Sequence, residues 1–490
     1  MPQEDMYGCP GNKQPGNRTC PVQGAEDPFV RGVTMLKVLR MFKKSTIFTV
    51  KTVLFVLLFS AFYGLFSIIA PQLLLPTRTM FITIAAYLLA SVLFLRIYGG
   101  VALGVKKSKD IIASVALATL FTDLVAFVEL VVMIRFEIIG EFYMLFIVFF
   151  IQLMLIIVLV YFGNWLFFKL NDPEKSILVY ADEEQAKEFI AKIGRYKKQW
   201  DLDFSLPYDT ENLFKRLYPY HTVFLMGLPN DLQCETLEFC YKYAKNVYVV
   251  PKLFDVILKN SKAVVIDDKT VYASYVSGLT TEQRVVKRLL DLVISVIGLV
   301  VASPFMLVCA LAVKLCDEGP VFYRQKRVTE NGAQFSVLKF RTMIVDAEKQ
   351  SGSVWAAKDD DRITPVGRVL RKLRLDELPQ LLNVLHGEMS IVGPRPEREE
   401  LIREFEKQYP EFRYRLKVKA GLTGLAQIMG KYNTTPLDKL MMDLEYIENY
   451  SIWMDFKLLF QTFKVFFKSD STEGVDRGGD EPEEDSQQAG

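Results

Sequence analysis

The sequence predicts a membrane protein made of three parts: an α-helical four-span bundle, a Rossmann-like α/β domain, and a mixed α/β domain with a re-entrant membrane helix hairpin and amphipathic interfacial helices. Three observations predict this fold class. Four long apolar runs lie in the first third of the chain, short strands alternate with helical patterns in the middle, and an apolar segment interrupted by proline opens the last part. A chain of 490 residues is also too long for one ordinary soluble domain.

The composition narrows the class of protein. Hydrophobic residues make up 51% of the chain and charged residues 24%, which combines membrane segments with a polar surface. The net charge is only +2, so we expect no nucleic-acid partner. The six cysteines include no C-x-x-C pair and are typical of reduced thiols, with a metal site or disulfide left open only at Cys9 and Cys20.

Each of the four apolar runs approaches or exceeds the roughly 20 residues needed to cross a bilayer. They cover residues 46–70, 79–98, 111–134 and 142–168. Basic residues gather before the first run and between the second and third, so the positive-inside rule places residues 1–45 and everything after the fourth run in the cytoplasm. We expect no secretory signal peptide. The third run holds Asp123 and Glu129, which either serve a function of their own or face sibling helices or a polar partner.

Residues 171–280 alternate strands with helical patterns, which predicts a small parallel α/β layer. The expected strands are Ser176–Asp182, Thr222–Pro229, Asn246–Pro251 and Lys262–Asp268. The first strand runs into "VYADEEQA", without the glycine turn that admits a pyrophosphate. Acids at that helix start would also repel a nucleotide phosphate. This degenerate Rossmann-like domain is therefore expected to be regulatory or structural, with nucleotide binding as the alternative.

A further apolar segment, about 285–316, has Ser303 and Pro304 at its centre. Proline removes a backbone donor and bends a helix. Basic residues flank both ends of its apolar core, Leu292 to Val313, and Lys287 and Arg288 are expected at the membrane surface before that core. These features favour a segment that enters one leaflet, turns at Ser-Pro and leaves on the same face. A spanning helix, the alternative, would put all later residues outside the cell.

Residues 320–468 are soluble in composition but include amphipathic pieces. The stretch "SIWMDFKLLFQTFKVFFKSD" predicts either an interfacial helix with lysines facing anionic lipid or a helix buried in a core. The last residues, 469–490, are acidic and glycine-rich, which is typical of a disordered tail.

Two adjacent carboxylates, Asp376 and Glu377, precede a short apolar helix. We expect Asp376 to cap this helix, Pro379 to lie in its first turn and Gly387 to end it. The carboxylates would then lie at the positive end of the helix dipole, where phosphate also binds. Simple capping is the other interpretation.

Cations flank these carboxylates on both sides. Arg368, Arg371, Arg374, Arg395 and Arg398 are close in sequence. A hairpin with its turn at Asn331-Gly332 is expected to present Lys339 and Arg341 to the same place, and a later helix carries Asp443 and Glu445. Arginine suits phosphate oxygens, and Mg²⁺ between carboxylate and phosphate would complete the charge balance.

Residues 284–468 closely resemble the catalytic domain of bacterial monotopic phosphoglycosyl transferases, the bacterial sugar transferase family. The motifs that carry the resemblance are Lys287-Arg288, Ser303-Pro304, "KFRTM", "LDELPQL", "GPRP", "GLTGLAQ" and "DLEYIENYS". The four spans and the Rossmann-like domain look like long-form members, which start capsule, O-antigen or exopolysaccharide synthesis at the cytoplasmic face of the bacterial inner membrane.

The resemblance implies a two-step transfer with Mg²⁺ as cofactor. Asp376 would attack a UDP-sugar and release UMP, and polyprenyl (undecaprenyl) phosphate would then take the sugar phosphate. Glu377 would assist Mg²⁺ or proton handling. Phosphate or nucleotide contacts would come from Lys339, Arg341, Arg371, Arg395 and Asp443. Membrane lipids are further partners, and a homo-oligomer is left open.

Arg374 departs from the family pattern, which has a small polar residue at this position; it could contact phosphate, tune sugar preference or face solvent. Two other classes of function remain. One is an inactive membrane scaffold or regulator, and the other is a polytopic transferase whose acids are Asp123 and Glu129. The sugar and the polysaccharide pathway are not determined by these residues.

Overall fold

The computed structural model describes residues 43–196, 199–259, 261–273, 278–316, 319–345, 360, 362–430 and 434–465. The predictions for most of the N-terminal segment, including Cys9 and Cys20, and for the acidic tail lie outside these residues.

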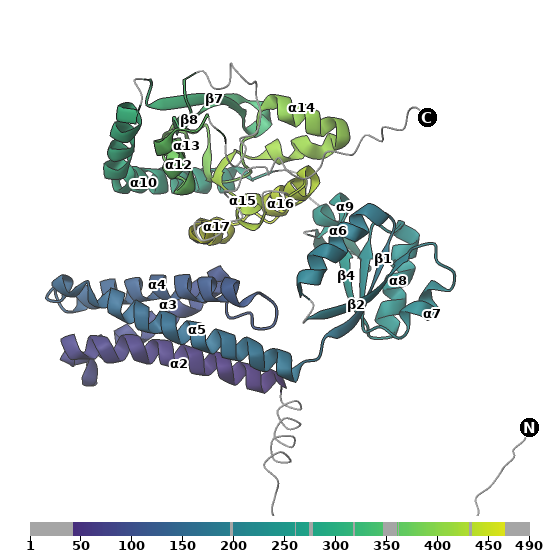
Figure 1. Ribbon diagram of the computed structural model, residues 1–490, viewed down its shortest axis with the longest axis horizontal. Helices are drawn as coiled ribbons and strands as arrows, with labels where there is room; N and C mark the ends of the chain where they lie inside the picture. Colours follow the sequence, from purple (N-terminus) through teal and green to yellow (C-terminus); the bar gives the residue numbers. More distant parts are fainter. Residues whose placement is uncertain are drawn as a thin grey trace, which may run out of the picture.

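Four long helices form a bundle along one side of the molecule (Figure 1). They are α2 (Lys43–Ile69), α3 (Arg78–Tyr98), α4 (Ser108–Met133) and α5 (Met144–Leu170), with short 3₁₀ turns η1 (Pro71–Leu74) and η2 (Ile139–Glu141) in the connections. Each long helix is long and apolar enough to cross a membrane. The four apolar runs predicted from the sequence are therefore four helices, and this is a membrane protein.

Asp123 of α4 lies inside this bundle and is 1% exposed. Gln152 of α5 donates from Nε2 to Asp123 Oδ1 (3.2 Å) and to the Leu58 carbonyl of α2 (3.1 Å). A polar side chain away from water stays favourable only when it is hydrogen-bonded, so these contacts hold three helices together. The expectation that Asp123 faces a polar partner on a sibling helix is confirmed.

The α/β domain contains a parallel sheet in the order β2-β1-β3-β4. The strands are β1 (Glu174–Tyr180), β2 (Trp200–Pro207), β3 (Thr222–Met226) and β4 (Asn246–Val250). Alternate residues of β1 face opposite ways: Ile177 and Val179 pack toward α7 (Leu213–Leu217) and α8 (Asn230–Lys242), and Leu178 packs toward α6 (Glu183–Ile193). Burial of both faces explains why β1 and β3 read as continuous apolar runs.

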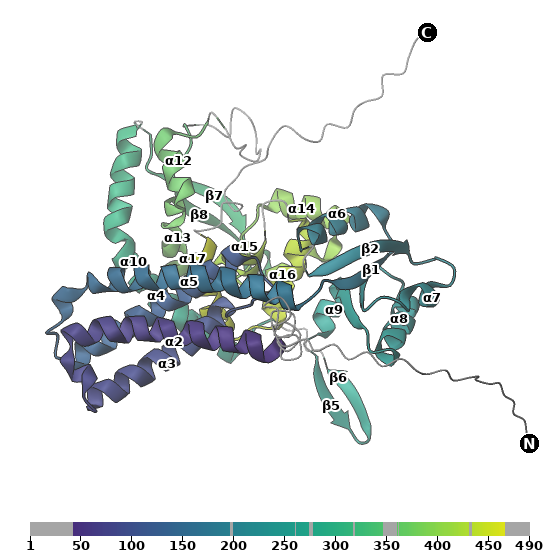
Figure 2. The ribbon, with the colours of Figure 1, turned by 60° about the horizontal axis from the view of Figure 1, so that its bottom comes forward.

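Two strand predictions in this domain need correction. Lys262–Asp268 was expected in the parallel layer, but β5 (Lys262–Ile266) pairs antiparallel with β6 (Lys269–Ala273) in a separate hairpin that projects from the domain (Figure 2). Strand β2 was not predicted, because it lies at the edge of the sheet and mixes polar with apolar residues.

Asp182, which follows β1, caps α6: its side chain accepts a hydrogen bond from the backbone N–H of Glu184 at 2.9 Å.

The third part packs short strands and helices around one apolar core. Its elements are α10 (Thr281–Cys316), β7 (Phe322–Val328), η4 (Glu330–Gly332), β8 (Gln334–Phe340), α12 (Pro365–Lys372), η5 (Leu375–Glu377), α13 (Gln380–His386), β9 (Ser390–Val392), α14 (Glu399–Gln408), η6 (Pro410–Lys417), β10 (Gly421–Thr423), α15 (Leu425–Met429), α16 (Pro436–Glu448) and α17 (Ile452–Val465). The core includes Val384 and Ile391, together with Leu440 and Leu444 of α16. It also takes in Val256 of α9 (Leu253–Leu258), which joins the α/β domain to this part.

Helix α10 contains Pro304, and its ribbon changes direction part-way along (Figures 1 and 2). Ser303 Oγ donates to the Val300 carbonyl at 2.8 Å. Proline inside a helix is a usual cause of a sharp bend. By length and composition α10 is also a fifth helix able to cross a membrane, so its re-entrant course stays a prediction.

Helix α17 lies between the core and the bundle. Leu458 and Val465 are buried in the core, whereas Phe460 packs against α3 and α4. Gln461 Nε2 donates to the Ile97 carbonyl at 2.6 Å. The interpretation of this stretch as a buried helix is therefore confirmed for one face, and its place in the lipid interface stays a prediction.

Candidate active site

The side chain of Asn383 on α13 forms hydrogen bonds with the backbone of strand β8. Asn383 accepts from the Leu338 backbone N–H (3.0 Å) and donates to the Ser336 carbonyl (2.8 Å). Its amide also donates to Glu388 at 2.6 Å. Because Asn383 is 6% exposed, these bonds fix the distance between the strand that carries Lys339 and the segment that carries Asp376 and Glu377.

Asp376 and Glu377 lie in the 3₁₀ turn η5, one turn before α13. The predicted helix start is thus wrong: Asp376 is not its cap, and α13 begins at Gln380 after Pro379. The turn is closed by Leu378 N–H, which donates to the Leu375 carbonyl at 3.3 Å. Gly387 ends α13 at φ +88°, as expected for a left-handed cap. A seven-residue helix has only a small dipole. The positive charge near the two carboxylates therefore comes mainly from side-chain cations.

Glu377 is held by two of these cations. Lys339 Nζ lies 3.0 Å from Glu377 Oε1, and Arg395 Nη2 lies 3.2 Å from the same oxygen. Burial alone would raise the pKa of Glu377, but Lys339, Arg395 and Arg374 outweigh burial and hold it below its ordinary value. Glu377 is therefore ionised at neutral pH.

The environment of Asp376 shifts its pKa the other way. Burial is the largest cause and raises the pKa, and the Glu377 charge raises it further. Lys339 and Arg371 oppose this shift. The two carboxyl groups of one turn thus have pKa values moved apart, which is typical of pairs with different chemical roles.

Arg371 is brought to this place by α12. Thr364 caps that helix, accepting from Gly367 N–H at 3.0 Å, and Arg371 Nε donates to Thr342 Oγ1 at 2.9 Å. Gly367 is required here, because a Cβ would lie only 2.1 Å from the Thr342 carbonyl oxygen. The structure therefore gathers Lys339, Arg371 and Arg395 around Asp376 and Glu377, as the sequence predicted.

Arg341 and Asp443, which were also expected to contact phosphate or nucleotide, are buried against protein groups. The Arg341 guanidinium packs against Gly319, where an added Cβ would be 1.8 Å from Nη1. Asp443 is paired with Arg415 at 2.7 Å, with both side chains almost fully buried. Its contact with the site is indirect, because Arg415 Nη2 also donates to the Arg395 carbonyl at 3.0 Å.

Two arginines that support the site were not predicted. Arg415 connects α16 to the backbone of Arg395, and Arg327 Nη1 donates to the Pro396 carbonyl at 3.2 Å. Burial lowers the pKa of Arg327 to about 10, although Glu397 opposes the shift. Nothing local in the sequence distinguishes these arginines from those on the surface, because their partners are distant along the chain.

Lys287 and Arg288, which were expected at the membrane surface, make contacts within the third part, and their place at the membrane surface stays a prediction. Lys287 is 5% exposed and its Nζ lies 2.7 Å from Asp455 Oδ2. Arg288 donates to the carbonyls of Val384 (2.6 Å) and Leu385 (2.8 Å), which satisfies the last turn of α13. Both residues tie α10 to the rest of the third part.

The donor set fits a magnesium ion only if substrate completes its coordination. No group of three or more His, Cys, Asp or Glu side chains within the described segments is arranged to hold a metal. Mg²⁺ is commonly bound through one or two carboxylates plus substrate phosphates and water, however. Asp376 and Glu377 meet that requirement.

Comparison with known proteins now identifies the family. The sequence model described as bacterial sugar transferase matches residues 282–469, which covers α10 from its second residue and the whole of the cationic site. A UDP-glucose:undecaprenyl-phosphate glucose-1-phosphate transferase of Caulobacter vibrioides is 40% identical over 190 residues, which is 38% of this chain and 71% of that relative. The chain belongs to the bacterial sugar transferase family.

Other bacterial sugar transferases match over a smaller share of their length. A UDP-N-acetylgalactosamine-undecaprenyl-phosphate N-acetylgalactosaminephosphotransferase of Aeromonas hydrophila is 41% identical over 183 residues, 37% of this chain and 43% of that protein. A UDP-glucose:undecaprenyl-phosphate glucose-1-phosphate transferase of Klebsiella pneumoniae is 40% identical over 227 residues, 45% of this chain and 49% of the relative. The chain thus spans about half the length of these relatives.

Proposed function

We propose that this chain transfers a sugar 1-phosphate from a UDP-sugar to polyprenyl phosphate, at the cytoplasmic face of the inner membrane, as the first membrane step of surface polysaccharide synthesis. The observation that carries the proposal is the turn in which Asp376, with its raised pKa, adjoins an ionised Glu377 among cations. Relatives whose names state a nucleotide sugar and undecaprenyl phosphate support the same substrates.

In the first step, a carboxylate oxygen of Asp376 attacks the β-phosphorus of the UDP-sugar. The bond from this phosphorus to the bridging oxygen breaks, and UMP leaves with that oxygen. The sugar phosphate is then covalently bound to Asp376. A carboxylate nucleophile divides one difficult displacement into two easier ones.

In the second step, an oxygen of polyprenyl phosphate attacks the same phosphorus. The bond to Asp376 breaks, the carboxylate is restored, and polyprenyl diphosphate sugar is the product. The attacking and leaving groups are both anionic. The protein therefore contributes mainly by positioning them and by stabilising their negative charge with cations.

The cations supply that charge. Lys339, Arg371 and Arg395 lie around the turn, and arginine forks match phosphoryl oxygens in two places at once. Mg²⁺ held by Asp376 and Glu377 would add Lewis-acid stabilisation of the phosphoryl oxygens.

The membrane helices support the proposed place of the reaction. Lys287 and Arg288 join the apolar helix α10 to the same body that carries Asp376. A re-entrant course of α10, with its bend at Ser303-Pro304, would keep this body at the cytoplasmic surface, where a lipid phosphate meets a soluble nucleotide sugar.

The test uses the full chain in membrane vesicles with a panel of UDP-sugars and polyprenyl phosphate. Wild-type protein should release UMP and show a phosphosugar adduct by intact mass. D376N should lower UMP release by at least about 10³-fold and form no adduct. The control D438N changes an exposed aspartate of α16 and should behave as wild type.

Two results would contradict the proposal. UMP release by D376N at the wild-type rate would favour a site among the spans, with Asp123 and Glu129 as its acids. No UMP release by wild-type protein with any donor would favour a scaffold or regulator.

A further inference from the structure

Strand β9 is completed along one edge by a side chain from the membrane helix α10. On the other edge, β9 pairs with β10, and Ser390 N–H donates to the Ala420 carbonyl at 2.8 Å. These two strands make up their whole sheet within the described residues. Ile391 N–H points away from β10 and donates to Asp291 Oδ1 at 2.9 Å, and Ser390 Oγ donates to the same oxygen at 3.0 Å. The Asp291 carboxylate thus takes the place of a neighbouring strand.

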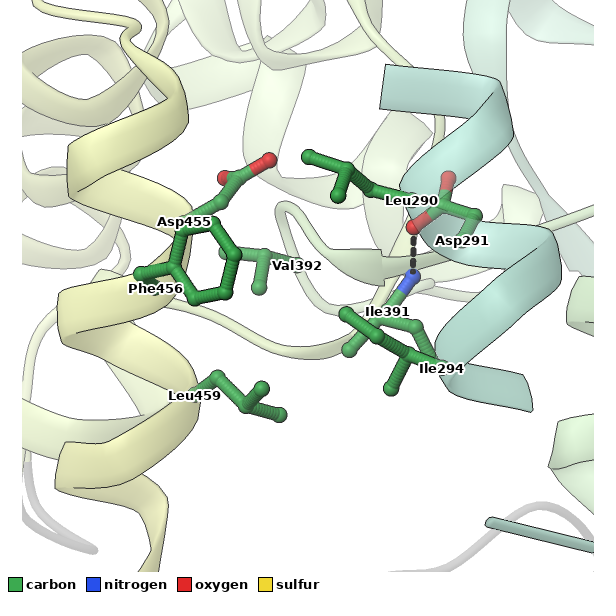
Figure 3. A pocket seen from close by; sticks show the side chains of 8 residues that line it. All are labelled: Leu290, Asp291, Ile294, Ile391, Val392, Asp455, Phe456 and Leu459. Carbon is green, nitrogen blue, oxygen red and sulfur yellow. Dashed lines mark hydrogen bonds between the residues drawn. The ribbon is translucent and has the colours of Figure 1, made fainter. Parts of the chain in front are cut away.

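Figure 3 shows the arrangement: α10 and α17 lie on opposite sides of β9, Asp291 comes from α10, and the bond from Ile391 N–H is dashed. Asp291 is 5% exposed. A buried backbone N–H without a partner destabilises the folded state, so this bond fixes the strand against the helix.

A second contact reaches the same strand from α16. The Tyr446 hydroxyl lies 3.2 Å from the Val392 carbonyl oxygen and donates to Asp455 Oδ1 at 2.8 Å. Lys287, one turn before Asp291 on α10, bonds both Tyr446 and Asp455. The membrane helix therefore holds β9 directly through Asp291 and indirectly through Lys287.

Strand β9 leads straight to the site. Gly393 and Pro394 follow it, and Arg395 is the residue whose Nη2 lies 3.2 Å from Glu377. The connection is rigid: Gly393 N–H donates to the Thr423 carbonyl and Gly421 N–H to the Pro394 carbonyl, both at 2.8 Å. A Cβ on Gly393 would lie 2.4 Å from the Lys419 carbonyl oxygen, so the two backbone segments are in close contact there. The position of β9 therefore determines the position of the Arg395 backbone, from which the guanidinium reaches Glu377.

We propose that Asp291 is a positioning residue for the transfer reaction: from the membrane helix, it holds β9 so that Arg395 meets Glu377. This inference rests on the proposed function. Asp291 itself touches neither Asp376 nor Glu377 in the contacts of the described residues, and its effect passes through Ser390 and Ile391. Asp291 is thus the direct link between α10 and the strand that leads to Arg395, beside the indirect link through Lys287.

Hydrogen exchange of the full chain in detergent tests the first half of the proposal. D291L removes the acceptor at similar size, D291N keeps an acceptor oxygen, and S390A removes one of the two bonds. D291L should speed exchange in peptides that cover residues 388–396, S390A should do so less, and D291N should not. The control S295A alters a buried serine one turn further along α10 that bonds its own helix. Unchanged exchange in both D291L and S390A would overturn the proposal.

A double-mutant cycle on UMP release tests the second half. D291L should slow release by about 10²-fold, because small displacements of a positioned group have effects of this size. D291N should recover most of the rate. R395A alone should be slow, and D291L added to R395A should slow it little further. If D291L does not fold, the cycle is run with S390A.

The outcomes separate the two proposals. Losses that multiply in the double variant would mean that Asp291 acts on the whole fold, and the positioning role would be wrong while the proposed function stood. A wild-type protein without UMP release would overturn the proposed function and the positioning role with it, whatever the exchange showed.

Discussion

Arg395 and Lys339 meet at a single oxygen, Glu377 Oε1, at 3.2 and 3.0 Å. These contacts keep Glu377 ionised, and its charge in turn raises the pKa of Asp376. In the proposed mechanism, Glu377 is the electrostatic support of the turn and Asp376 is the group that reacts. Pairs of acids with pKa values driven apart by their surroundings are a common way to divide such roles.

The first prediction concerns pH. In the proposed mechanism only the ionised form of Asp376 attacks, so UMP release should fall as the pH drops through the pKa of Asp376, which burial and Glu377 raise above its ordinary 3.8. E377Q removes the neighbouring charge, so the pKa of Asp376 should decrease and the acid limit of the profile should move to lower pH. Single-turnover UMP release across pH measures this limit. E445Q, on α16 beside Lys259, is the control. An acid limit that stayed or rose in E377Q would contradict the assignment of Asp376 as the titrating nucleophile.

The second prediction distinguishes the effect of the backbone conformation of Arg374 from the effect of its side-chain charge. This residue has φ +53°, a left-handed conformation that glycine adopts without strain. Its charge also acts on Glu377 and Asp376. R374G should keep the turn but raise KM for the UDP-sugar about tenfold, the effect of one lost charged contact, and R374K should stay near wild type. If R374G equals wild type, the side chain of Arg374 makes no contribution to donor binding, and only the left-handed backbone at this position matters.

The third prediction concerns Lys339. K339M removes the ammonium group that pairs with Glu377 and leaves that carboxylate with Arg395, so phosphate binding and turnover should both weaken. A loss of about 10–100-fold in kcat/KM corresponds to one buried charge contact. K326M, on the exposed face of the paired strand β7, is the matched control. Equal effects of K339M and K326M would mean that Lys339 supports the hairpin rather than the site.

Features with a local cause were predictable from the sequence. The hairpin turn needs left-handed residues, and Asn331 and Gly332 adopt φ +57° and +79°. Gly387 ends α13 for the same reason. The four apolar runs became helices because their length and composition leave few other structures in a membrane.

Features that depend on distant partners were not predictable. Asp443 and Arg415 are far apart in the chain, and the sequence shows two charges but not that they pair. The start of α13 was misplaced because two rules competed: an aspartate can cap a helix, but Pro379 begins the regular hydrogen bonding one turn later. Asp291 gave no signal at all, since one acid at the start of an apolar segment is ordinarily a surface residue.

The last prediction concerns the packing of α17 against helices α3 and α4 of the bundle. The Phe460 ring lies 5.3 Å from the ring of Phe94 and 5.2 Å from that of Phe121, measured between centroids. F460A should therefore lower the unfolding midpoint of the detergent-solubilised chain, by a loss of about 1–3 kcal/mol of packing free energy.

Phe463 provides the comparison. It touches Phe121 from the same helix but is 45% exposed, so F463A should lower the midpoint less than F460A. Y98F removes only the hydroxyl that donates to the Phe460 carbonyl at 2.9 Å, and should cost about 1 kcal/mol. If F460A and F463A lowered the midpoint equally, the rings would be acting through general apolar exposure, and the docking of α17 on α3 and α4 would not be what holds the catalytic part to the spans.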